Sequence, residues 1–122
     1  ADLMAHAWLA YCDQRLGRHA EAVGRADKVL TRDPTQPVAH LVFAQEALTT
    51  GDWEATRAHA QQALDHPPTR EAALATLAAM ALVTDDARGA AELTAELLRQ
   101  NPRSRVGLWL ASEVDRQGRD RD

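Results

Sequence analysis

A chain of 122 residues has the length of one domain, and its 45% hydrophobic and 26% charged residues are typical of a soluble globular protein. The formal net charge of −4 argues against the basic surface that non-specific nucleic-acid binding requires. Aromatic residues make up only 4%, so the core must consist mainly of alanine, leucine and valine, which favours packed helices over a β-sandwich. The single cysteine, Cys12, can form neither an internal disulfide nor a thiolate metal cluster.

Apolar residues recur at helical spacing along the chain, and turn-forming residues separate the segments. In chain order this spacing predicts helices over about residues 3–16, 19–30, 37–49, 53–65, 70–83, 87–99 and 105–117. Gly17 and Gly51 can adopt the left-handed geometry that ends a helix, and Asp85 stands at the third equivalent position. Asp52 and Ser104 are suited to cap the helices that follow them. We therefore expect an all-α fold of about seven helices.

The same residue types return every 34 positions. The columns are Pro34, Pro68 and Pro102; Leu30, Leu64 and Leu98; Leu9, Phe43, Leu77 and Ala111; Ala10, Ala44, Ala78 and Ser112; and Ala5, Ala39, Ala73 and Gly107. A period of this length is the signature of a helical repeat. We expect one domain, residues 1–122, with repeats at about 3–36, 37–70 and 71–104, a capping helix at about 105–117 and a frayed tail at 118–122.

With these columns the chain resembles a tetratricopeptide repeat protein over nearly its whole length. That family repeats a helix–turn–helix every 34 residues, with the pattern W-x2-L-G-x2-Y…A-x3-F…P. The second repeat here reads His40-x2-Phe43-Ala44-x2-Ala47 and then Thr56-x3-Ala60…Pro68. The period, the small residues and the prolines match, whereas the tryptophan, tyrosine and phenylalanine of the family are absent from their positions. The resemblance implies a right-handed α-solenoid of antiparallel helix pairs.

The resemblance also implies a function, because family members are mostly interaction modules whose first helices line a concave groove. The residues expected to point into that groove are Ala7, Tyr11, Leu41, Gln45, Leu48, Ala75, Ala79, Leu82, Trp109 and Glu113. Some members clamp a peptide carboxylate with cationic residues, but Arg15 is the only cation near these positions, so the clamp is not carried over. A largely apolar groove favours an amphipathic helix or apolar peptide as the partner.

The histidines invite a metal-site interpretation, which their spacing does not favour. His6 and His40 occupy equivalent positions on helices that pack roughly 8–10 Å apart, too far for both to bind one zinc ion at ~2.1 Å. A half-buried ring in place of the family tryptophan is the favoured interpretation. His59 and His66 lie about two turns apart on one helix, ~10 Å. With no nucleophile–base pair, P-loop or H-E-x-x-H motif, we expect no cofactor, no metal and no enzymatic activity.

Three apolar features leave alternatives open. We expect Trp53 to fill the corner between two helices, whereas Trp109 suits contact with a partner and simple capping equally well. Residues 72–83 are apolar on all sides, so their open side is either covered by a partner or is merely exposed alanine. This run is shorter than the ~20 residues of a membrane span, and no signal peptide is visible. We therefore expect a cytoplasmic protein without membrane insertion.

Two further functions stay open beside peptide binding. The apolar face could close a homodimer or continue a longer array, which would make the chain a structural scaffold segment. The start at Ala1 instead of methionine also fits a regulatory domain of a larger enzyme or transcription regulator.

Overall fold

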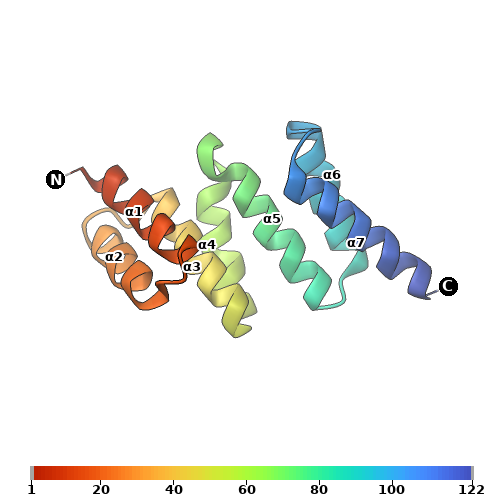
Figure 1. Cartoon of the computed structure of the whole chain (residues 1–122), viewed down its shortest axis with the longest axis horizontal. Helices are drawn as coiled ribbons and strands as arrows, with labels where there is room; N and C mark the ends of the chain where they lie inside the picture. The colour runs from red at the N-terminus through yellow and green to blue at the C-terminus, as the bar shows by residue number, and fades with distance from the viewer. Residues whose placement is uncertain (1, 122) are drawn as a thin grey trace.

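The computed structural model describes residues 2–121, which form seven α-helices and no strand, so the expected all-α fold is confirmed. In chain order the helices are α1 (Leu3–Arg15), α2 (His19–Arg32), α3 (Pro37–Thr50), α4 (Trp53–Leu64), α5 (Pro67–Val83), α6 (Ala87–Gln100) and α7 (Arg105–Arg121) (Figure 1). No helix in this range combines the length and the apolarity needed to cross a bilayer.

Two helix ends lie three or more residues from the expected ones. Helix α5 begins at Pro67, because a proline in the first helical turn lacks only an amide hydrogen that would be unpaired there anyway. Pro67 and Pro68 therefore form the start of α5, in addition to following the end of α4. Helix α7 continues to Arg121, so residues 118–121 extend it and do not form a separate tail. A single Gly118, which costs about 1 kcal/mol of helix propensity, does not end the helix.

Each helix pair turns at a residue with left-handed backbone geometry, as expected. The φ angles are +82° at Gly17, +80° at Gly51 and +66° at Asp85, three positions spaced 34 residues apart. Trp53 packs at the second of these turns and stays partly exposed there. Its ring lies against Gly51, where an added Cβ would be 3.8 Å from Trp53 Cζ2, and more than a third of the residue is exposed. Trp53 therefore covers the turn from outside.

Side-chain caps begin five of the seven helices and satisfy amide groups that have no partner within the helix. Asp52 Oδ1 accepts from the Ala55 amide at 3.2 Å, and Ser104 Oγ accepts from the Gly107 amide at 3.0 Å, so both expected caps are confirmed. The other three caps are Asp2, Gln36 and Asp86. These local signals fix where the helices begin.

The helices pack in a regular order along the long axis of the molecule, with the chain termini at opposite ends (Figure 1). Each helix contacts the next one, and α1 also contacts α3, α3 contacts α5, and α5 contacts α7. Within residues 2–121, the even-numbered helices α2, α4 and α6 do not contact one another. The odd-numbered helices therefore form the continuous row of the molecule.

Small residues let neighbouring helices approach closely. Ala39, Ala73 and Gly107 are buried members of one 34-residue column. At Gly107 an added Cβ would lie 2.6 Å from Leu97 Cδ2 and 2.9 Å from Leu98 Cδ2, so the leucines of α6 pack directly on the backbone of α7. Gly107 thus lets α7 pack closely on α6.

Candidate functional site

Two of the ten predicted groove residues cannot contact a partner. Ala7 is 0% exposed and Leu41 is 1% exposed, so both belong to the core. Leu41 packs with Ala63 and Ala73 where α3, α4 and α5 meet. Ala7 lies in the cluster formed by α1, α2 and α3. The odd-numbered helices approach closely enough to bury both side chains, which corrects their assignment to an open groove.

The other eight predicted residues reach the surface to different extents. Trp109 is 57% exposed. The half-buried residues are Tyr11, Gln45, Leu48, Ala75, Ala79, Leu82 and Glu113. The column Ala7, Leu41, Ala75 and Trp109 therefore changes from fully buried on α1 and α3 to half-buried on α5 and exposed on α7. This one column of the predicted groove is therefore accessible only toward the C-terminal half of the chain.

Tyr11 is engaged in packing. Its ring meets the Trp8 ring edge-to-face, with the ring centroids 5.6 Å apart and the planes at 85°, a favourable geometry for an aromatic pair. Tyr11 also packs against the clusters that contain Ala7 and Leu41. Only part of its ring remains accessible for a partner.

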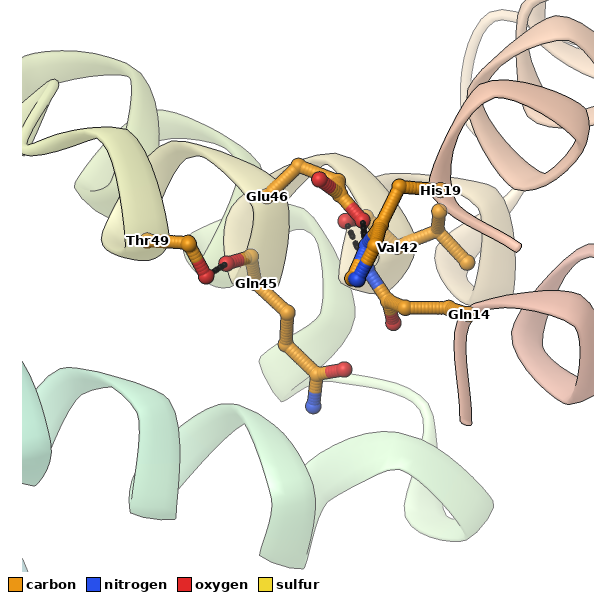
Figure 2. A network of polar contacts seen from close by, with 6 residues as sticks. All are labelled: Gln14, His19, Val42, Gln45, Glu46 and Thr49. Atoms are coloured by element: carbon orange, nitrogen blue, oxygen red, sulfur yellow. Dashed lines mark hydrogen bonds and ion pairs between the residues drawn. The ribbon is translucent and has the colours of Figure 1, made fainter. Parts of the chain in front are cut away.

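A polar network joins the first helix pair to α3 (Figure 2). Gln14 Nε2 donates to the Val42 carbonyl at 2.9 Å and to Glu46 Oε1 at 3.1 Å, and His19 Nδ1 lies 2.6 Å from the same Glu46 oxygen. The side chain of Gln45, one of the predicted groove residues, points away from His19 and Glu46 (Figure 2). The network borders a cavity of about 250 Å³ whose lining includes Gln45 and Arg15. Sequence reasoning missed Gln14, His19 and Glu46, because their contacts join different helix pairs.

Two histidines that the sequence did not pair lie together between α3 and α4. His40 Nδ1 is 2.9 Å from His59 Nδ1, and His40 Nε2 is 2.7 Å from the Pro34 carbonyl oxygen. A carbonyl only accepts, so His40 Nε2 carries a proton, Nδ1 of neutral His40 is an acceptor, and His59 Nδ1 donates to it. Phe43 stacks on the His59 ring at 5.4 Å between centroids. His40 is buried, so its ring is covered more fully than the half-buried ring expected at this position.

Burial is the main cause that lowers the pKa of His59 below its ordinary value of 6.5. The nearby His40 lowers this pKa further, and Asp52 acts in the opposite direction. The pair therefore favours the neutral form of His59. No third histidine, cysteine, aspartate or glutamate within the described range joins it in a group that could hold a metal ion.

A cavity between α1 and α2 was not predicted. It measures about 750 Å³, and its lining includes Arg25, Lys28 and Arg32 from α2 and Leu3 and His6 from α1. The three basic residues are spaced at i, i+3 and i+7, so they share one face of the helix. This spacing is the sequence signal that could have predicted a basic helix face here.

Comparisons of the chain with protein-family models, with curated proteins and with solved structures found no match. The resemblance to tetratricopeptide repeats therefore stays a prediction based on the residue columns.

Proposed function

We propose that the chain is a right-handed α-solenoid of the tetratricopeptide repeat type and that it binds a protein or peptide along α3, α5 and α7. The left-handed turn residues spaced 34 apart support the repeat. Contacts between successive odd-numbered helices, and their absence between even-numbered ones in the described chain, support a two-layered stack with one continuous row. The proposal includes no catalytic step.

The observation that carries the binding proposal is the exposure of Trp109. More than half of this large residue is accessible, at the position that the half-buried Ala75 occupies one repeat earlier. Leu48 and Leu82, which are equivalent residues on α3 and α5, are also half-buried. Tryptophan is one of the residue types enriched among the energetic anchors of protein interfaces. An amphipathic helix that lays its apolar face on these side chains fits this surface.

Selection from a displayed library of amphipathic helical peptides tests this proposal. Peptides selected on the wild-type chain are expected to bind at least roughly tenfold more weakly to the Trp109→Ala variant, because loss of an anchor costs about 2 kcal/mol or more. Ala79→Glu, which places a charge between the apolar residues, should have the same effect. Ala91→Glu, at an exposed position on α6, is the matched control. The proposal would be contradicted if the peptides bound Trp109→Ala and Ala79→Glu as tightly as they bind the control Ala91→Glu. Circular dichroism must show the same helix content for all three variants.

A second candidate function, self-association, is favoured by the outer face of α1. Leu9 is 48% exposed and Leu16 is 68% exposed, and with Ala5 and Cys12 they form a stripe with the 4-3-4 spacing of a helix–helix seam. In the later repeats the residue equivalent to Ala5 is buried against the preceding even-numbered helix. No preceding helix covers this stripe on α1 in the described chain.

Sedimentation over a range of protein concentrations tests self-association. The wild-type chain is expected to form a dimer as its concentration rises, and the double variant Leu9→Glu/Leu16→Glu is expected to stay monomeric. Both side chains are largely exposed, so the variant should keep the helix content of the wild type. A wild-type chain that remains monomeric at all concentrations would remove this second candidate.

A further inference from the structure

The cavity of about 750 Å³ between α1 and α2, called the cleft from here on, combines apolar and basic lining residues. Leu3 supplies apolar surface, the buried Val29 lies at the base of the cleft, and Gly24 is also in the lining. An added Cβ at Gly24 would meet no atom within 4 Å, so glycine is not required there by packing. The equivalent residues on α4 and α6 are Ala58 and Glu92, so the repeat does not require glycine either. Gly24 keeps space open in the cleft.

The cleft also concentrates positive charge on a chain whose net charge is negative. Arg25 Nε lies 3.2 Å from Asp13 Oδ2, which holds one of the three basic side chains in place. Among residues 2–119, whose side chains the structure describes, no hydrogen bond or ion pair engages the side chain of Lys28 or Arg32. Glu21 is the one acidic residue in the lining. Two cationic groups are therefore available to a ligand.

This combination is specific to the first helix pair. The residues equivalent to Arg25 and Lys28 are His59 and Gln62 on α4, and Leu93 and Glu96 on α6. The residues equivalent to Arg32 are His66, which precedes α5, and Gln100 on α6. In the second pair the residues equivalent to His6 and Arg25 are the hydrogen-bonded His40 and His59. In the third pair they are Leu74 and Leu93, which pack in one cluster. In the first pair, His6 and Arg25 both line the cleft. The space between the two helices, which the equivalent side chains fill in the second and third pairs, is therefore open in the first pair.

We propose that this cleft binds a small amphipathic anion, with its apolar chain in the cleft against Leu3 and its charged head on Lys28 and Arg32. A volume of about 750 Å³ lies within the range of small-molecule sites. Arginine and lysine form charge-assisted hydrogen bonds with carboxylate and phosphate oxygens, which are stronger than neutral ones. The site is independent of the proposed peptide surface, because it lies on α1 and α2 and not on α3, α5 and α7.

Calorimetric titration with decanoate tests the site, with decyl phosphate to compare the two head groups and decanol as the uncharged control. Decanoate or decyl phosphate is expected to bind the wild-type chain, and decanol at least roughly tenfold more weakly. The double variant Lys28→Glu/Arg32→Glu should lose binding to a similar extent. Gly24→Leu should also weaken it, because the new side chain enters the cleft without a clash. Arg57→Glu, on the exposed part of α4, is the charge control, and Trp109→Ala should leave binding unchanged.

Lys28 offers a second measurement because it is the only lysine in the chain. The bound anion is expected to protect its amine from acetylation relative to the N-terminal amine, as measured by mass spectrometry. Binding that is equal in the wild type, Gly24→Leu and the charge-reversed variant would overturn the proposal. So would a lack of binding by both anions. An acidic helical peptide that requires Lys28 and Arg32, while both small anions fail, would overturn it and assign this surface to a protein.

Discussion

Replacing Leu41 with alanine is expected to lower the free energy of unfolding by about 2–5 kcal/mol. The side chain is 1% exposed and is among the largest that are fully buried. Its neighbours Ala63 and Ala73 are small, so they cannot move into the space that the substitution leaves. Chemical denaturation followed by circular dichroism measures the loss through the transition midpoint.

Leu48→Ala is the matched control for this prediction, because the same substitution is made on the same helix at a half-buried site. We expect it to cost less than Leu41→Ala, since less apolar surface returns to water. Equal losses at the two sites would show that Leu41 is not the central contact between α3, α4 and α5. Leu41→Glu would bury a charge and unfold the chain, so it cannot serve as a test of partner binding.

Leu41 also shows why the predicted groove was only partly accessible. Its equivalents are Ala7, Ala75 and Trp109, which the repeat places on one face of successive helices. Whether that face is open depends on the distance between the helices, which is determined by residues on the neighbouring elements. Ala7 and Ala75 are the same residue type, yet one is buried and the other half-buried. Sequence periodicity gave the face of the helix but not its accessibility.

The helices and turns could be predicted well because their signals are local. Gly17, Gly51 and Asp85 adopt the left-handed geometry that their position after a helix indicated. Asp52 and Ser104 cap the helices that follow them through bonds to residues three positions away. Such contacts depend on the backbone of one turn, so the nature of the residue and its position are sufficient to predict them.

The histidine pair and the cleft could not be predicted in the same way, because they depend on two helices of one pair facing each other. The sequence comparison matched His40 with its equivalent, His6, whereas its partner in space is His59 on the next helix. The same pairing of positions gives a packed contact between Leu74 and Leu93 and an open cleft in the first pair. The same two positions therefore hold hydrogen-bonded histidines in the second pair, packed leucines in the third pair and the lining of an open cleft in the first pair.

The chain is expected to lose stability when the pH falls below 6.5, because of His59. Burial and the neighbouring His40 lower the pKa of His59 in the folded chain, so the unfolded chain takes up a proton first. The contribution of the neutral ring to stability is therefore complete above pH 6.5. It declines as the pH falls from 6.5 toward the lowered pKa, and it levels off below that pKa. Denaturation midpoints measured across this range give the slope.

A double variant with the residues of the third helix pair separates this effect from the other histidines. His40→Leu/His59→Leu copies Leu74 and Leu93, and its stability is expected to depend less on pH below 6.5 than that of the wild type. His40→Ala is instead expected to cost about 2–3 kcal/mol at neutral pH, because the Pro34 carbonyl and His59 Nδ1 both lose their partner. If the double variant and the wild type lost stability equally on acidification, the pair would not be the cause.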